Sequence, residues 1–168
     1  KSKHGIKVVH DSVTAIDPDT RTVKVSGGLI KYDRLIVSPG ITLLNDEIEG
    51  LDAGGRAVFP AAWSAGPETQ QLREELVGMQ AGGTVVMSVP FGPYRCPPGP
   101  YERACLIADF LKKHKRGSKL IVLDSNEKIV SKGKLFKSAW DAYYNDVIDY
   151  RTGSAVVKVD ASSRTIST

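Results

Sequence analysis

The stretch VPFGPYRCPPGPYERACLIADFL, from Val89 to Leu111, decides the predicted fold. It follows the apolar, β-type run GTVVMS and leads toward a second such run, KLIVLD. Small and apolar residues recur at helical spacing in its second half, which predicts a helix from about Pro100 to Lys115. A strand, a loop, a helix and a strand in this order predict the parallel βαβ unit of a Rossmann-like α/β domain.

The loop of this unit does not fit a phosphate site. A dinucleotide-binding loop uses G-x-G-x-x-G so that the backbone can approach the pyrophosphate at the helix N-terminus. Here Gly92 and Gly99 are far apart, and three prolines have no N–H to offer a phosphate: Pro97, Pro98 and Pro100. Asp124 ends KLIVLD where a ribose-binding carboxylate would stand, but it also fits a simple strand-end turn. We therefore predict that this unit does not bind a nucleotide.

The same loop suits a reactive thiol. Cys96 precedes a helix N-terminus, whose partial positive charge favours a thiolate, and Arg95 adds to that charge. Glu102 follows in the first helical turn, close enough to exchange a proton with a species bound at the sulfur. A simpler interpretation stays open, in which the cysteine only packs and the glutamate only complements the helix dipole.

Cys105 is predicted to be a small buried residue that faces the sheet. A second redox role, with a bridge to Cys96, stays open. The two cysteines do not form a disulfide framework, and the three histidines do not stand at metal-ligand spacing, so no metal site is predicted.

Two more helices complete the predicted βαβα order. PETQQLREELVGM places Pro67 at an early position and three apolar residues on one face: Leu72, Leu76 and Met79. GKLFKSAWDAYYND has an aromatic-rich face made of Phe136, Ala139, Trp140 and Tyr143.

The first part of the chain predicts short antiparallel strands, because apolar residues alternate around the turn signals DPDT and SGG. The run RLIVSPG differs from them. It is a short apolar run that ends at Pro39 and Gly40, as expected of a buried parallel strand that stops at a ligand crevice.

An internal repeat links the two ends of the chain. VTAIDPDTRTV, Val13 to Val23, aligns without a gap to VVKVDASSRTI, Val156 to Ile166. Chance remains an explanation for one short match, but the order of elements favours two tandem dinucleotide-binding-type domains with inserted antiparallel β-meanders. We predict the end of a first FAD-binding segment over 1–45, a connector and helix over 46–80, and a truncated NAD-domain-like second domain over 81–168.

Composition limits the functional classes. The net charge is +4, and much of it lies in KKHKRGSK from Lys112 to Lys119. This run fits a solvated helix C-terminus, although a dock for an anionic partner stays open. Little aromatic interleaving and no nucleic-acid motif argue against nucleic acid, and no apolar run reaches the roughly 18 residues of a membrane span.

The decapeptide RCPPGPYERA resembles the flavoprotein subunit of flavocytochrome c sulfide dehydrogenase, a relative of sulfide:quinone oxidoreductase. The resemblance extends to YDRLIVSPGI, AAWSAGPETQQLR, KLIVLDSN and AVVKVD, and so to nearly the whole chain. It implies an FAD-dependent enzyme of the periplasm that oxidises sulfide and passes electrons to a c-type cytochrome subunit.

The resemblance also implies roles for single residues. Cys96 would be one half of a redox disulfide beside the flavin, and Glu102 an acid or base. The strand end from Ser38 through Pro39 to Gly40 would line the FAD, and the strand around Val13 would approach the adenine. The partner cysteine and the FAD fingerprint of the family are not among these residues, so the chain as given is expected to be inactive and without FAD.

Three alternatives remain. The first is a quinone-linked sulfide oxidoreductase. The second is a non-catalytic binding module that keeps the fold. The third is an NADH-dependent disulfide reductase, which the missing G-x-G-x-x-G disfavours.

Overall fold

A computed structural model of the chain describes residues 4–168. The chain divides into two compact units, Lys1–Ile41 and Thr42–Thr168, and each is described by itself. The first three residues of the predicted segment 1–45 lie outside the described residues, and the proposed domain limits stay predictions. Within residues 4–168, no helix has the length and apolar character needed to cross a membrane.

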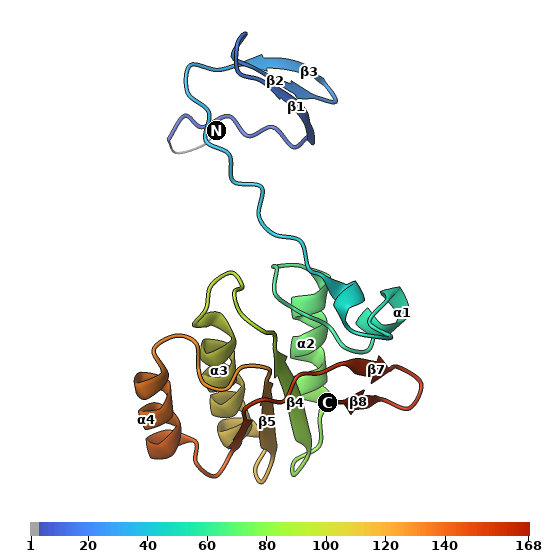
Figure 1. Cartoon of the computed structure of the whole chain (residues 1–168), viewed down its shortest axis with the longest axis vertical. Helices are drawn as coiled ribbons and strands as arrows, with labels where there is room; N and C mark the ends of the chain where they lie inside the picture. Colours follow the sequence, from blue (N-terminus) through green and yellow to red (C-terminus); the bar gives the residue numbers. More distant parts are fainter. Residues whose placement is uncertain (1–3) are drawn as a thin grey trace. The chain divides into compact units, whose positions relative to one another are not determined.

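The first unit contains the predicted antiparallel meander (Figure 1). Its strands are β1 (Val13–Asp17), β2 (Thr22–Val25) and β3 (Gly28–Lys31), in that order in the sheet. The Asp11 carboxylate accepts hydrogen bonds from the backbone N–H groups of Ser26 and Gly27, which fixes the turn between β2 and β3.

The prediction of a buried strand at RLIVSPG is wrong for this structure. The segment 35–41 forms no strand, and its apolar side chains are exposed, with Ile36 89% accessible. A strand is stabilised by hydrogen bonds to its neighbours and by packing on its faces. The other strands of this unit form a separate antiparallel sheet, so the described part of the unit gives the segment no parallel neighbour.

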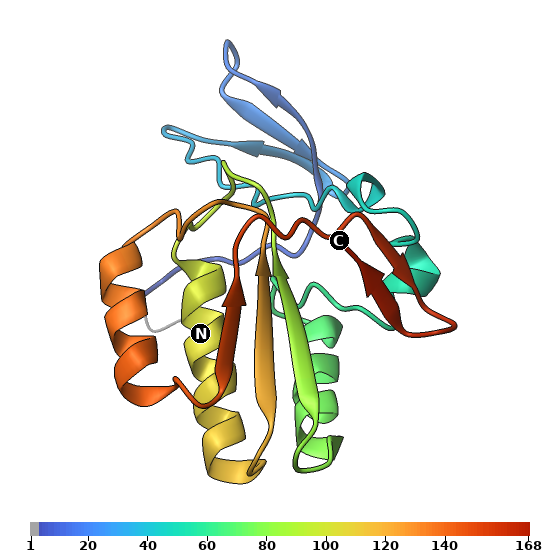
Figure 2. The same cartoon turned by 60° about the horizontal axis from the view of Figure 1, so that its bottom comes forward.

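The second unit is built on a parallel sheet, as predicted. Strands β4 (Thr84–Val89), β5 (Lys119–Asp124) and β6 (Ile148–Arg151) lie in the order β4-β5-β6. Helix α3 (Gly99–His114) connects the first pair and α4 (Gly133–Tyr143) the second. Both helices lie with α2 (Pro67–Gly78) on one face of the sheet (Figure 2). Strand β6 was not predicted, because IDYR is short and half polar.

The core lies between this sheet and the helices. Helix α3 presents one fully or nearly fully buried face, made of Tyr101, Ala104, Ile107, Ala108 and Leu111. It packs on β5, where Leu120 and Val122 are completely buried. Each such aliphatic side chain contributes roughly 1.5–3 kcal/mol by leaving water. The two alanines keep the middle of this face small, as the sequence predicted.

Two details of the helices differ from the predictions. Cys105 flanks the buried face of α3 and accepts a hydrogen bond from Trp140 Nε1 of α4 at 3.1 Å, so it faces a helix and not the sheet. Tyr143 is 64% exposed, and Tyr144 packs against the core in its place. Tyr143 is the last residue of α4, and Tyr144 follows it with non-helical backbone angles.

The connector before α2 contacts the hairpin at the C-terminal end of the chain. It contains a 3-10 turn, η1 (Asn45–Glu47), and a short helix, α1 (Ala53–Arg56). Glu49 forms a parallel bridge with Lys158 in the hairpin of β7 (Lys158–Asp160) and β8 (Thr165–Ser167). A Cβ at Gly50 would lie only 2.1 Å from the Val159 carbonyl oxygen, so this contact requires glycine.

The internal repeat is confirmed in three dimensions. Asp17 and Asp160 occupy equivalent positions, and each carboxylate accepts the backbone N–H groups two and three residues later. Arg21 and Arg164 both take the left-handed conformation, with φ of 52° and 53°. A turn followed by a left-handed residue is a standard hairpin connection. The shared sequence therefore specifies one hairpin, used twice.

The basic run at the end of α3 serves local structure. Lys112 Nζ donates to the Tyr143 carbonyl at 2.7 Å, and Lys115 Nζ donates to the Val77 carbonyl at 2.5 Å. Lys113 pairs with Asp109 one turn earlier in the helix. These contacts favour the interpretation of the run as a solvated helix end that binds neighbouring carbonyls.

The turn at Asp160 gives a pH prediction. Hydrogen bonds from the Ser162 hydroxyl and from the Ser163 and Ser162 backbone lower the pKa of Asp160 to about 2. The ionised carboxylate therefore stabilises the hairpin above pH ~4, and this contribution is lost as the pH falls through about 2. A carbon NMR titration of the carboxyl should show this low midpoint, and Ser162→Ala should raise it. A parent midpoint near 4 would contradict the assigned hydrogen bonds.

Candidate functional site

Cys96 lies in the loop that joins the carboxyl end of β4 to α3. It is exposed and takes a left-handed backbone conformation, with φ of 54°. Its carbonyl accepts the Gly99 N–H at 2.8 Å, which closes a tight turn onto the helix. Pro98 caps the helix and Pro100 follows within its first turn, so proline rings restrict the backbone around the cysteine. The residue is thus presented to solvent by a stiff loop.

The Cys96 sulfur lies against the first turn of α3, beside an aromatic ring. A Cβ added at Gly99 would lie 3.4 Å from Cys96 Sγ and 2.8 Å from Trp63 Cη2. The second distance is shorter than a real carbon contact, so only glycine allows the Trp63 ring to pack here. The sulfur and the indole therefore occupy neighbouring positions at the start of the helix.

Arg103 holds the segment that carries Trp63. Its Nη1 donates to the Ala61 carbonyl at 2.7 Å, and its Nη2 donates to the Ala62 carbonyl. Its guanidinium carbon lies 5.7 Å from the centre of the Trp63 ring, a cation–π distance. Burial lowers the pKa of Arg103. One side chain of α3 therefore binds both the backbone and the ring of this segment.

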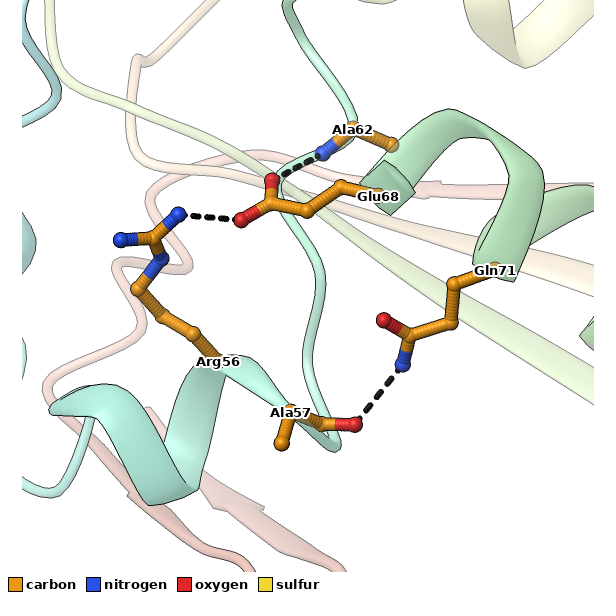
Figure 3. A network of polar contacts seen from close by, with 5 residues as sticks. All are labelled: Arg56, Ala57, Ala62, Glu68 and Gln71. Carbon is orange, nitrogen blue, oxygen red and sulfur yellow. Dashed lines mark hydrogen bonds and ion pairs between the residues drawn. The ribbon is translucent and has the colours of Figure 1, made fainter. Parts of the chain in front are cut away.

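A second set of contacts fixes the same segment from α2 (Figure 3). Glu68 accepts the Ala62 N–H at 3.0 Å and pairs with Arg56 of α1. The hydrogen bond from Arg56 lowers the pKa of Glu68. Gln71 also donates to the Ala57 carbonyl at 2.8 Å. Ala62, which is 1% exposed and has a φ of 48°, is thus held from both sides.

A buried carboxylate lies at the carboxyl end of β5. Asp124 is fully buried, and its Oδ2 accepts the hydroxyls of Tyr101 at 2.8 Å and Tyr150 at 2.7 Å. Its Oδ1 accepts the backbone N–H and the side-chain amide of Asn126. Burial raises the pKa of both tyrosines, which therefore keep their protons and remain donors. Asp124 joins β5, α3 and β6 and has no free oxygen to offer a ribose.

Asn126 connects this buried carboxylate to the cysteine loop. Its amide nitrogen also donates to the Pro90 carbonyl at 3.0 Å, and its oxygen accepts the Gly92 N–H at 3.1 Å. Further along the loop, the Tyr94 hydroxyl donates to the Pro97 carbonyl at 3.4 Å. The loop that presents Cys96 is therefore fixed near its first residues by a side chain from the end of the neighbouring strand.

The start of α3 offers little to a phosphate, as the sequence indicated. Pro97, Pro98 and Pro100 have no N–H, and the Gly99 N–H already binds the Cys96 carbonyl. A hollow of about 340 Å³ lies at the other end of the sheet, where it is lined by Thr84, Lys119 and Asp149, among others. Ligands of parallel sheets bind at the carboxyl ends of the strands, so this hollow is in the wrong place for such a site.

Two of the six predicted site residues, Cys96 and Glu102, lie at the start of α3: one in the loop before it and one in its first turn. Glu102 is exposed in the first turn of α3, the helix that begins just after Cys96. The other four belong to the first unit and are exposed there: Val13, Ser38, Pro39 and Gly40. Their roles stay predictions.

Three residues that shape the site were not predicted from the sequence: Trp63, Arg103 and Asn126. No periodicity or motif links these residues to Cys96, since their contacts depend on tertiary packing. The stretch AAWSAGP does contain Trp63, and the glycine at 99 in an otherwise bulky loop was a signal of close packing.

The buried carboxylate gives a stability prediction. Tyr101→Phe removes one donor to Asp124 and one acceptor for the Val130 N–H. We expect the free energy of unfolding to fall by about 1–3 kcal/mol, because buried polar atoms lose a partner. Urea denaturation measures this change. Tyr143→Phe, at an exposed position, is the control and should leave the stability unchanged. Equal stability of both variants would contradict the described network.

A known protein family matches the part of the chain that contains the cysteine loop. The model of the family described as "Sulfide dehydrogenase [flavocytochrome c] flavoprotein chain, central" matches residues 69–168, which is more than half of the chain. The match covers β4, the cysteine loop, α3 and the rest of the parallel sheet. The chain therefore belongs to the family of flavocytochrome c sulfide dehydrogenase flavoprotein chains, of which it contains the central region.

Proposed function

We propose that this chain is part of an FAD-dependent sulfide dehydrogenase of the periplasm, in which Cys96 is one half of the disulfide that reacts with hydrosulfide. The observation that carries the proposal is the position of Cys96, exposed beside the first turn of α3 on a stiff loop within the matched family region. The family name supports a c-type cytochrome as the electron acceptor.

The first unit has features that fit a bound FAD. Ser38, Pro39 and Gly40 are exposed, and Gly40 has a φ of 85° with open space where a Cβ would be. The backbone there is therefore accessible to a large ligand, and Val13 on β1 is also exposed. When bound, FAD would accept an electron pair and release single electrons to a haem, as a two-electron donor and one-electron acceptors require.

Cys96 would act in the first chemical step. Hydrosulfide attacks one sulfur of the disulfide, a new S–S bond forms, and the old S–S bond breaks. The products are a persulfide on one cysteine and a thiolate on the other, so atoms and charge balance. The Cys96 sulfur lies beside the first turn of α3. Its exposure gives the small anion access.

Glu102 would move the proton of this step. The persulfide formed by hydrosulfide carries one proton, and a carboxylate in the first turn of the helix that follows the loop can accept it. Glu102 is exposed, and its backbone N–H donates to the Pro98 carbonyl at 3.0 Å, which fixes its place at the start of α3. The proposal requires this exposed side chain to turn toward the sulfur.

Cys105 does not suit the role of partner. Its sulfur accepts the Trp140 N–H and packs against the core. It lies six residues into α3, roughly 9 Å along the helix axis from Gly99, whereas a disulfide requires about 2 Å between sulfurs. The partner sulfur would come from another part of the enzyme.

Sulfide titration of the full-length protein tests the proposal. Under anaerobic conditions, sulfide should bleach the flavin absorbance and produce a long-wavelength charge-transfer band. Cys96→Ser should abolish this response, because no disulfide is left to attack. Cys105→Ser is the matched control and should respond like the parent. Unchanged flavin reduction in Cys96→Ser would show that the assigned role is wrong.

Glu102→Gln tests the proton step. We expect the rate of flavin reduction by sulfide to fall about 100-fold, the lower end of what a positioned acid or base contributes. The pH dependence of that rate should also lose the limb that belongs to the carboxylate. Stopped-flow absorbance measures both. Retention of the parent rate and pH profile would remove Glu102 from the mechanism.

A further inference from the structure

We propose that Trp63 is a positioning residue for the Cys96 sulfur: its indole forms a fixed wall that leaves the sulfur open to solvent on the opposite side. The inference rests on the proposed function, since it concerns the same thiol. It adds a segment outside the matched family region, because Trp63 precedes residue 69.

The geometry at Gly99 carries the inference. The space that a Cβ would fill at this residue is bordered by Trp63 Cη2 at 2.8 Å, Trp63 Cζ3 at 3.4 Å and Cys96 Sγ at 3.4 Å. The ring and the sulfur thus share the small space above one glycine. While the indole stays there, the sulfur cannot move further into the space above Gly99.

The wall is rigid because its backbone is bound on both sides. Arg103 donates to the Ala61 and Ala62 carbonyls, and Glu68 accepts the Ala62 N–H. Ala62 is almost fully buried in a left-handed conformation that most residues avoid. The Arg103 guanidinium also faces the ring. These contacts fix the two residues before Trp63 and add one contact to its ring.

A fixed wall has a consequence for reactivity. Attack on a sulfur requires access along the S–S axis, so closing one side limits the directions of approach. Cys96 remains exposed, which leaves the solvent side for a small nucleophile. We expect the wall to slow bulky reagents and to hold the sulfur in one orientation.

Alkylation of the reduced 168-residue chain tests the wall. Trp63→Ala should raise the rate at which a bulky maleimide labels Cys96, by about 3–10-fold, because thiol reactivity depends on access. Trp63→Phe keeps a ring and should restore a rate within about twofold of the parent. Peptide mass spectrometry separates Cys96 from Cys105, whose unchanged labelling shows that the chain is folded. Equal Cys96 rates in the parent and Trp63→Ala would overturn the proposal.

Gly99→Ala gives a second test that keeps the indole. The new methyl group would displace the Trp63 ring, so labelling of Cys96 should rise as in Trp63→Ala. Gly78→Ala is the matched control, since a Cβ there meets nothing within 4 Å, and it should have no effect. If Trp63→Ala also raises the labelling of Cys105, that variant is unfolded. The labelling rate of Cys96 in Gly99→Ala then tests the proposal. A parent-like rate in Gly99→Ala would then overturn the proposal.

Fluorescence supplies a direct readout of how close Trp63 lies to the Cys96 sulfur. A mixed disulfide formed at Cys96 should quench the Trp63 emission, because the two side chains are neighbours. The quenching should vanish in Trp63→Phe, where Trp140 still emits. Its persistence there would contradict the proposal. Failure of the proposed function would look different: the full-length protein would not respond to sulfide, although the labelling and fluorescence results in this chain held.

Discussion

The buried carboxylate of Asp124 is the constraint on which the carboxyl end of the sheet depends. It ends β5, and its four donors come from α3, from β6 and from the residue two positions later. A buried charge is tolerated only when its hydrogen bonds are complete. The elements that supply the donors are therefore held together, and Asn126 extends this order into the cysteine loop.

Near this carboxylate, the loop before α3 presents the Cys96 thiol. In a nucleotide-binding loop, glycines leave the backbone N–H groups free at the helix N-terminus. Here prolines remove several of these groups, and one glycine is kept where Trp63 needs the space. The partial positive charge of the helix N-terminus remains. The same strand, loop and helix thus present a sulfur where a related domain would hold a pyrophosphate.

Much of the second unit could be predicted from local sequence. The apolar runs of β4 and β5 and the periodic faces of α2 and α3 are local signals, and so is the hairpin repeated at Asp17 and Asp160. Strand β6 was missed because its short, half-polar sequence becomes a strand only beside β5. RLIVSPG shows the opposite case, since its strand-like sequence lacks a parallel neighbour among the described residues. Cys96 and Glu102 could be selected from the sequence because they stand at the start of a predicted helix. Trp63 and Arg103 could not, because their roles depend on tertiary contacts that no local pattern encodes.

Whether Cys96 belongs to the disulfide that hydrosulfide opens can be tested by differential alkylation of the full-length enzyme. The protein is labelled before and after anaerobic sulfide, and peptide mass spectrometry is the readout. Cys96 should be protected in the oxidised enzyme and become labelled once sulfide is added, as a thiol or a persulfide. Cys105, the internal reference, should label equally in both samples. Equal labelling of Cys96 before and after sulfide would contradict its place in the disulfide.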